Sequence, residues 1–399
     1  MTALAASTLL LLLLATNLAA PHAALTTVAA GDPRFVKWMG RALLGASGPG
    51  TVSGDFAGLT ASLSVVNATY VLANISDGCT NGNKLVVRLA GAGFAAAQPL
   101  ATLYTTPAVA TYSLFAQGQV PFTATLSLTK AVEARFTMCG AEPATRLVFL
   151  SFSTDGSFAP APPPSHRRLE LLGDSITSGD AVLCPPPLFN DASIWTDDWT
   201  LTSGALLCAA FGADCNAVSW GGMGMAGNDV ETWTWPHFPD IYNWTLGWEG
   251  FSRGAGAPPD PLPWDFASFV PAGIIIGLGT NDAWPGRFNN ASFAAAFEAT
   301  YTAFVLRVAA TYSPPPVFFL GIGPMRFEYG PSVLRVLASL QNAGVAAHAI
   351  NYSLGHPCGC GHPSAADAAQ MAALAAPVIA QALQWDLPPA AVALGAASL

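Results

Sequence analysis

The sequence predicts two domains, an all-β sandwich followed by an α/β domain with a parallel sheet. The length of 399 residues exceeds that of one ordinary domain. A Pro-rich segment at 159–167 divides the chain and is expected to be an extended linker. Short alternating runs precede this linker, whereas apolar runs alternate with Ala-rich helical runs after it.

Residues 1–30 are expected to form a secretory signal peptide that is cleaved between Ala19 and Ala30. The leucines from 9 to 14 are too few to span a bilayer but fit the core of such a leader. No later segment is expected to anchor the mature chain in a membrane, so we expect a secreted or lumenal protein. Five sequons are compatible with glycosylation, at Asn67, Asn74, Asn243, Asn290 and Asn351.

The net charge argues against one class of partner, and the cysteines predict disulfides. The net charge is −9, and no cluster of Lys and Arg is visible, so nucleic acid is not expected as a partner. In an oxidising compartment we expect disulfides. The cysteines are Cys79, Cys139, Cys184, Cys208, Cys215, Cys358 and Cys360. Because their number is odd, at least one stays unpaired or pairs between chains.

The first domain, residues 31–158, contains several short runs that are β-branched or alternate in polarity. Turn-forming residues such as Asp77-Gly78 separate some of these runs. The predicted strands are 59–66, 70–72, 84–89, 111–115, 122–128, 132–138 and 147–153. Short strands at roughly even spacing predict a sandwich.

The second domain, residues 168–399, alternates predicted strands with helices. The strands are expected at 169–172, 215–220, 273–278 and 317–322, and the helices at 201–211, 293–310 and 365–383. This alternation predicts a parallel sheet that is covered on both faces. Functional groups in such sheets collect at the carboxyl ends of the strands.

Gly173-Asp174-Ser175 follows the first of these strands. A serine at a turn that opens into a helix exposes its hydroxyl, and the helix N-terminus offers N–H groups to a developing oxyanion. Such a serine needs a base to remove its proton before it can act as a nucleophile. The alternative is a simple Asp-Ser turn or helix cap.

Two further motifs end neighbouring strands. Asn281, in Gly-Thr-Asn-Asp at 279–282, can aim its amide at an oxyanion, or can form an Asx-turn or helix cap. Gly222, in Ser-Trp-Gly-Gly at 219–222, allows a close approach of its backbone N–H, or forms a plain tight turn.

His362 is the best candidate for the base, because it lies in a loop just before the last helix; His356 is the second candidate. The cluster of His356, Cys358, Cys360 and His362 also suggests soft metal ligands. Its spacing differs from that of usual zinc sites, and a secretory route favours disulfides to distant cysteines. We therefore expect neither a metal nor a cofactor.

These four blocks, in this order, resemble the SGNH hydrolases, the GDS-type esterases. The resemblance implies a flavodoxin-like three-layer domain, with Ser175 as nucleophile and His362 as base. It also implies an oxyanion hole made by the N–H groups of Ser175 and Gly222 and the side chain of Asn281. The G-x-S-x-G elbow of α/β-hydrolases does not surround Ser175.

A narrower resemblance, to carbohydrate esterase family two, covers nearly all of the chain after the leader. It rests on residues 37–41, 127–134, 168–177, 215–220 and 358–363. That family joins an N-terminal jelly roll to an SGNH domain and removes O-acetyl groups from plant-type polysaccharides. The resemblance therefore implies an acetylated polysaccharide or oligosaccharide as substrate, and we expect a monomer.

One departure concerns the acid that orients the base. Family-two enzymes often carry an Asp two residues before the histidine, where this chain has Cys360, and no Asp or Glu occurs between Glu328 and His362. The resemblance to members with a Ser–His dyad implies that a backbone carbonyl holds the other ring nitrogen. Such a carbonyl stabilises the imidazolium less than a buried carboxylate does, so slower or lost turnover is an alternative.

The loops of the second domain are rich in tryptophan. Trp284 lies three residues after Asn281 and is the predicted substrate-binding residue, because sugar rings pack on aromatic faces. Core or interdomain packing is expected for most of the others, which are Trp195, Trp199, Trp233, Trp235, Trp244 and Trp248. Two rival functions remain: hydrolysis of other acyl esters, lipids included, and glycan binding by a catalytically weakened protein.

Overall fold

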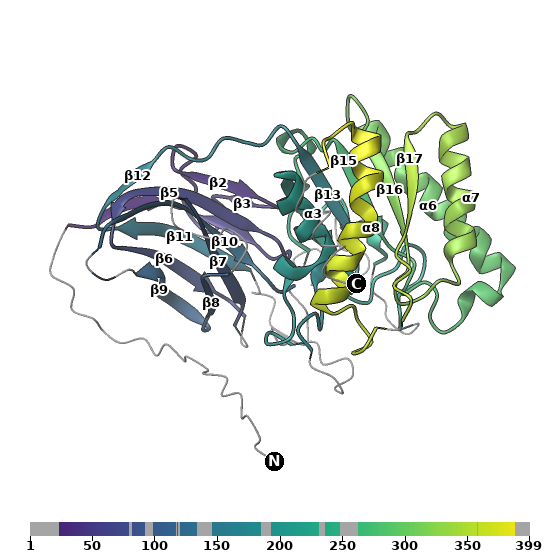
Figure 1. Ribbon diagram of the computed structural model, residues 1–399, viewed down its shortest axis with the longest axis horizontal. Helices are drawn as coiled ribbons and strands as arrows, with labels where there is room; N and C mark the ends of the chain where they lie inside the picture. The colour runs from purple at the N-terminus through teal and green to yellow at the C-terminus, as the bar shows by residue number, and fades with distance from the viewer. Residues whose placement is uncertain are drawn as a thin grey trace, which may run out of the picture.

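Two domains lie side by side along the long axis of the molecule (Figure 1). The structure, a computed structural model, describes residues 24–79, 82–91, 99–116, 118, 120–133, 146–184, 193–230, 236–247, 262–356 and 358–387. The first domain contains strands only, and the second contains a parallel sheet with helices on both faces. These sheets and helices are consistent with the two-domain architecture that the sequence predicts.

The first domain is a sandwich of two antiparallel sheets. One sheet comprises β1 (Thr26–Ala29), β3 (Leu43–Leu44), β4 (Val52–Gly54), β6 (Tyr70–Asp77), β9 (Ala108–Ala116) and β11 (Leu147–Thr154). The other comprises β2 (Val36–Met39), β5 (Thr60–Ala68), β7 (Lys84–Ala90), β8 (Ala101–Tyr104), β10 (Phe122–Lys130) and β12 (Ser157–Ala159). Their orders are β3-β4-β11-β6-β9, with β1 beside β11, and β12-β5-β10-β7-β8, with β2 beside β5.

Alternating side chains of both sheets fill the space between them. In β6, Val71, Ala73 and Ile75 are fully buried, whereas the residues between them are partly exposed. Leu126 and Leu128 of β10 enter the same cluster from the other sheet. This period of two is what a strand with one buried face requires. The jelly-roll connectivity implied by the resemblance stays a prediction.

Two sequence predictions change at the edges of this domain. Thr26–Ala29, assigned to the leader, forms β1 and pairs with β11, so the sandwich begins before residue 31. Leader cleavage that preserves this strand must fall before Thr26. The predicted strand at 132–138 lies mostly outside the described residues, and Val132 and Glu133 belong to no strand.

The second domain is built on a five-stranded parallel sheet. Its strands are β13 (Arg168–Gly173), β14 (Asp214–Ser219), β15 (Gly273–Gly277), β16 (Val317–Ile322) and β17 (Ala347–Asn351). The order β14-β13-β15-β16-β17 corresponds to 2-1-3-4-5 in chain order, which is flavodoxin-like. The sequence did not predict β17, which is short and contains alanine, histidine and asparagine.

Helices cover both faces of this sheet, and Figure 1 shows α8 on one face and α6 and α7 on the other. They are α3 (Ser203–Phe211), α6 (Ala291–Thr311), α7 (Gly330–Asn342) and α8 (Ala365–Leu383). Leu169 and Leu171 of β13 contact the cluster of α3 and α8, whereas Leu172 contacts that of α6 and α7. Although α6 and α8 are long and apolar enough to span a membrane, both pack on the sheet.

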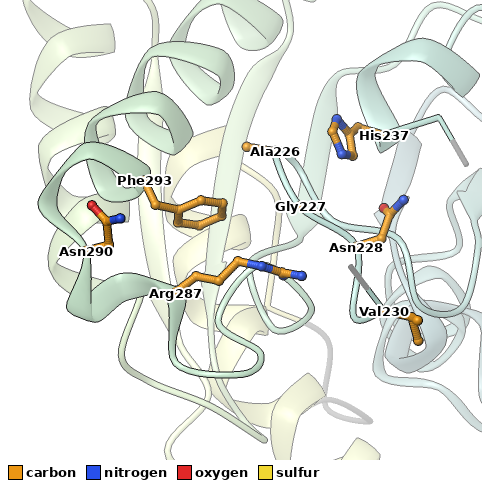
Figure 2. A pocket seen from close by; sticks show the side chains of 8 residues that line it. All are labelled: Ala226, Gly227, Asn228, Val230, His237, Arg287, Asn290 and Phe293. Carbon is orange, nitrogen blue, oxygen red and sulfur yellow. The ribbon is translucent and has the colours of Figure 1, made fainter. Parts of the chain in front are cut away.

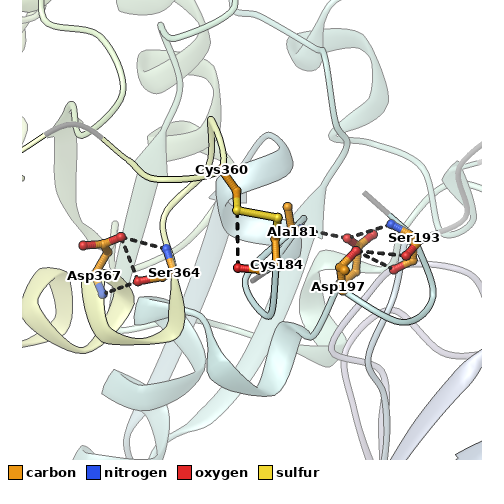
Figure 3. Close-up of a disulfide and its surroundings, with 8 residues drawn as sticks. Ala181, Cys184, Ser193, Asp197, Cys360, Ser364 and Asp367 are labelled. Atoms are coloured by element: carbon orange, nitrogen blue, oxygen red, sulfur yellow. Dashed lines mark hydrogen bonds between the residues drawn. A yellow bond between two sulfur atoms is a disulfide. The ribbon is translucent and has the colours of Figure 1, made fainter. Parts of the chain in front are cut away.

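The cysteines form both long-range and local disulfides. Cys184 pairs with Cys360 across 176 residues, as Figure 3 shows, and Cys208 pairs with Cys215. Cys79 is also disulfide-bonded. Cys358 is the free thiol in the described part of the chain, and burial raises its pKa to about 11.

Candidate active site

Ser175 and His362 meet at the carboxyl end of the parallel sheet. Ser175 follows β13 and begins α2 (Ser175–Ser178), a single helical turn, and His362 lies in the loop between β17 and α8. His362 Nε2 is 2.8 Å from Ser175 Oγ. The two residues are 5% and 9% exposed. A hydroxyl and an imidazole at this distance form the hydrogen bond through which a base activates a serine.

The local sequence explains the sharp turn that presents Ser175. A Cβ on Gly173 would lie 2.1 Å from Thr177 Oγ1, so only glycine allows the turn to fold back on the strand. Asp174 caps the helix by accepting a hydrogen bond from Ile176 N at 3.0 Å. Gly179, at a φ of 88°, ends the helix after one turn.

Gly222 lies in the loop that follows β14, beside the strand that leads to Ser175. Its φ of 81° is in the left-handed region, which favours glycine, and its carbonyl accepts a hydrogen bond from Asp229 N at 3.0 Å. Among the described residues, neither Gly222 N nor Ser175 N donates to a protein acceptor. Both N–H groups are therefore available to a ligand.

Asn281 follows β15 and connects the two segments that carry Ser175 and Gly222. Its amide Nδ2 donates to Asp174 Oδ2 at 3.2 Å and to Met223 O at 2.8 Å. These contacts place the amide beside the residue that precedes Ser175 and the residue that follows Gly222. Both amide hydrogens already have protein acceptors, so a substrate oxygen would share one of them.

The sequence analysis did not predict the burial of Asp174 and Asp282, the two aspartates beside the site. Burial raises the pKa of Asp174 to about 7, and the nearby charges of Asp282 and Glu133 act in the same direction. Burial also raises the pKa of Asp282 to about 6, although three backbone donors lower it. Those donors are Met225 N, Ala226 N and Gly227 N, at 2.6 to 2.9 Å. Asp282 thereby holds the segment that follows the glycine loop.

Glu133, which follows β10 of the first domain, is another residue that the sequence analysis did not connect with the site. Its Oε2 accepts hydrogen bonds from Ser178 Oγ at 2.6 Å and from Gly221 N at 2.9 Å. A carboxylate from one domain thus contacts the helix and the loop of the other. Only the fold reveals this, because 45 and 88 residues separate the partners.

The alternative base and the alternative metal site are not supported by the geometry. His356 Nε2 lies 3.4 Å from Asp367 Oδ1, and it is His362 that contacts Ser175. Cys360 is in a disulfide and so is not available as a thiolate ligand. The backbone carbonyl expected at the other ring nitrogen of His362 stays a prediction.

The tryptophans divide into exposed and packed residues. Trp284 is 47% exposed, and the guanidinium of Arg326 lies 4.5 Å from the centre of its ring. Trp195 is 62% exposed beside Tyr104 of the first domain. Trp199 and Trp244 contribute to the core clusters, as expected. Trp233, Trp235 and Trp248 lie outside the described residues.

An open cavity of about 420 Å³ lies between the segment at 226–230 and the side chains of Arg287 and Phe293 (Figure 2). Its lining is Ala226, Gly227, Asn228, Val230, His237, Arg287, Asn290 and Phe293. Arg287 Nη1 donates to Asn281 O at 3.1 Å, which connects the cavity wall to the site. Neither Ser175 nor His362 lines it, so it is a neighbour of the site rather than the site itself.

Two curated proteins resemble part of the chain. It is 28% identical over 192 residues to the cellulase/esterase CelE of Acetivibrio thermocellus, covering 47% of this chain and 21% of that protein. It is 31% identical over 156 residues to the acetylxylan esterase / glucomannan deacetylase of Cellvibrio japonicus, covering 38% of each. The matches thus span about a fifth and about two fifths of these relatives' lengths. No protein-family model matches the chain.

Solved structures resemble nearly the whole chain. A family two carbohydrate esterase from Cellvibrio japonicus superposes with a TM-score of 0.74 at 21% identity, over 90% of this chain and 98% of that one. A family two carbohydrate esterase from Clostridium thermocellum in complex with cellohexaose gives 0.73 at 22%, over 88% of this chain and 100% of that one. The predicted resemblance to this family is confirmed, and its fold is the fold of this chain.

Proposed function

We propose that this chain hydrolyses O-acetyl esters on polysaccharides, with Ser175 as nucleophile and His362 as base. The observation that carries the proposal is the 2.8 Å contact between Ser175 Oγ and His362 Nε2 at the carboxyl end of the sheet. The site lies where the strand order reverses, between β13 and β15, which is where ligands bind in sheets of this kind. The resemblance to proteins named as esterases supports the same reaction.

The reaction proceeds in two balanced steps. His362 Nε2 takes the hydroxyl proton as Ser175 Oγ attacks the acetyl carbonyl carbon, and the same proton then goes to the departing sugar hydroxyl. Water next attacks the acetyl-enzyme, with His362 again as base, and releases acetate and the free serine. In both steps the carbonyl oxygen becomes an oxyanion, which Ser175 N–H and Gly222 N–H would stabilise together with the Asn281 amide.

The proposed catalytic unit is a Ser–His dyad. None of the 33 residues immediately before His362 is acidic. Asp367, five residues after His362, contacts His356 and Ser364. A dyad stabilises the imidazolium less than a triad with a buried carboxylate does. We therefore expect a lower kcat than that of an enzyme with an Asp at this place.

The substrate is proposed to be an acetylated plant-type polysaccharide or oligosaccharide. One relative is named an acetylxylan esterase / glucomannan deacetylase, and one similar structure holds cellohexaose. The exposed indole of Trp284 follows Asn281 by three residues and would offer a flat face to a sugar ring. We further propose that the chain is secreted and glycosylated, as the apolar run at residues 9–14 and the sequons led us to expect, and that it acts as a monomer.

Replacing the nucleophile tests the reaction. Ser175→Ala should lower the release of acetate from acetylxylan and from acetylated glucomannan to background, a fall of at least about 10³-fold. Trp284→Ala should raise KM for the polysaccharide and leave turnover of 4-nitrophenyl acetate unchanged. Acetate release by Ser175→Ala at the wild-type rate would refute the assignment.

Two measurements separate the rival functions. A series of 4-nitrophenyl esters of increasing acyl length should show activity that falls steeply beyond acetyl; sustained activity on long chains would favour a general esterase or lipase. Binding of a soluble glycan without any acetate release would favour the weakened, glycan-binding alternative.

A further inference from the structure

We infer that Glu133 is a positioning residue through which the first domain holds the oxyanion-hole loop and the nucleophile's helix together. The inference rests on the proposed function, which it extends to the other domain. It makes the sandwich a part of the catalytic apparatus and not only a neighbour of it.

A single carboxylate oxygen joins the two segments. Glu133 Oε2 accepts from Ser178 Oγ, in the helical turn that Ser175 begins, and from Gly221 N, the residue before Gly222. The Ser178 and Ser219 hydroxyls lie 2.9 Å apart, which extends the contact to the end of β14. Glu133 is 1% exposed, so water does not compete for these bonds. Hydrogen bonds to a charged acceptor are about twice as strong as neutral ones.

The two contacts act on the groups that would bind the oxyanion. The hydrogen bond to Gly221 N orients the peptide just before Gly222, whose N–H is one proposed donor. The hydrogen bond to Ser178 holds the end of the turn whose first residue supplies the other backbone donor and the nucleophile. An oxyanion hole stabilises the transition state only if its donors stay where the charge develops. Fixing both segments from one atom keeps their spacing constant.

The charge of Glu133 acts on other buried charged groups, among them the cation Lys130. Lys130, three residues earlier, is fully buried, and the charges of Asp55, Asp77 and Glu133 oppose the burial that lowers its pKa to about 8. The charge of Glu133 also reaches Asp174, where it acts in the same direction as burial. The carboxylate is therefore close to the residue that precedes the nucleophile.

Other contacts hold the domains together, so Glu133 is not needed for that purpose. Lys37 Nζ lies 2.6 Å from Asp214 Oδ1, at the amino end of β14, whereas Glu133 acts at the carboxyl end of the same strand. Lys84 Nζ lies 3.0 Å from Asp198 Oδ2 and donates to Asp197 O. Lys37 provides a matched control, since its side chain crosses the domain boundary away from the site.

Three variants test the inference: Glu133→Ala, Glu133→Gln and the control Lys37→Met. With 4-nitrophenyl acetate, Glu133→Ala should lower kcat about tenfold to a hundredfold with KM within a factor of about three, because the donors are loosened rather than removed. Glu133→Gln keeps an oxygen in the same place and should recover part of the rate. Lys37→Met should leave kcat unchanged. A kcat for Glu133→Ala within twofold of wild type would overturn the inference.

A boronic acid inhibitor, which forms a tetrahedral adduct with the serine, separates positioning from mere packing. Its Ki should rise in Glu133→Ala by the same factor by which kcat falls, whereas affinity for the glycan should not change. A fall in kcat with an unchanged Ki would contradict the role.

Amide hydrogen exchange tests the inference independently of turnover. Exchange in residues 175–178 and 219–223 should be faster in Glu133→Gln than in wild type, and unchanged in Lys37→Met. Unchanged exchange in Glu133→Gln would overturn the positioning role even if the enzyme is active. Faster exchange in Glu133→Gln, combined with a wild type that shows no esterase activity, would instead overturn the proposed function and keep the positioning role.

Discussion

At the residue scale, Ser175, the proposed nucleophile, lies beside several buried carboxyl groups. Asp174 precedes Ser175 and is fully buried, and it contacts Asn281, whose amide is the proposed oxyanion donor. Burial disfavours the charged form of a carboxyl group, and the negative charges of Asp282 and Glu133 disfavour it further. The protonation of Asp174 is therefore coupled to the stability of the site.

This coupling predicts a pH dependence of stability with a definite sign. The pKa of Asp174 is about 7 in the folded chain, against an ordinary value of 3.8 for an aspartate carboxyl group, so the folded state binds the proton more tightly. The protonated carboxyl group of Asp174 contributes to the free energy of unfolding. This contribution is fully present below about pH 4 and is lost as the pH rises through about 7. By the size of the shift it amounts to at most about 4 kcal/mol.

Asp174→Asn should reduce the loss of stability between pH 4 and pH 7, because the amide carries no titrating proton. The measurement is the free energy of unfolding at several pH values between 4 and 8, compared between wild type and variant. An identical pH slope in the two proteins would show that Asp174 does not titrate in this range. Ser175→Ala, which leaves the carboxyl in place, is the control.

At the element scale, the loop that carries His362 is held at both ends. Two residues before the histidine, Cys360 is bonded to Cys184, in the segment that follows the nucleophile's helix (Figure 3). Two residues after it, Ser364 caps α8, and Asp367 closes the capping box. The dyad joins residues 187 apart in the chain, and the disulfide crosses nearly the same gap.

Removing this disulfide should therefore affect both stability and catalysis. The double variant Cys184→Ser/Cys360→Ser opens a long loop, which costs about 4–5 kcal/mol of stability in the chain-entropy model. It should also lower kcat by about tenfold or more, because the imidazole is no longer tethered to the helix side of the site. Unfolding by urea and release of 4-nitrophenol measure the two effects.

The second disulfide supplies the control. Cys208→Ser/Cys215→Ser removes a bond that closes a separation of only seven residues between α3 and β14. It should cost less stability and leave kcat unchanged. Equal losses of kcat in the two double variants would argue against a specific tether.

At the scale of the whole molecule, a buried cation joins the domains. Arg41, from the first domain, donates to Tyr242 O and Trp244 O, and its Nη2 lies 3.6 Å from Glu170 Oε1 in β13. Its guanidinium also lies 5.2 Å from the centre of the Trp264 ring. Glu170 accepts a further hydrogen bond from the Tyr242 hydroxyl at 2.9 Å. An unpaired charge in this place would be costly.

Arg41→Met should destabilise the protein by about 3–5 kcal/mol, because it leaves the Glu170 carboxylate buried without its cation. Adding Glu170→Gln should recover part of this loss, since the uncompensated charge is then removed. Thermal unfolding of the wild type should be one transition, as the domains are coupled, whereas Arg41→Met should separate it into two. A single transition at the wild-type Tm in Arg41→Met would refute the coupling.

Much of the candidate site could be predicted because short local motifs indicate its residues. Gly173-Asp174-Ser175 and Asn281 each follow an apolar strand, and parallel strands bring their carboxyl ends to one edge. His362 stands just before a helix with a strong capping signal. Strand β17 was missed because its alanine and polar residues lack the apolar run of its neighbours, and it is set by pairing with β16.

The sequence by itself determined the order of the β sandwich and the parallel sheet and singled out Ser175 and His362 as the candidate pair, since each depends on patterns within a few residues. Only the tertiary structure decided that Glu133 contacts Ser178 and Gly221 and that Cys184 pairs with Cys360. These contacts join residues that are 45 to 176 positions apart. No local pattern contains them, because the packing of complete elements determines which distant side chains meet.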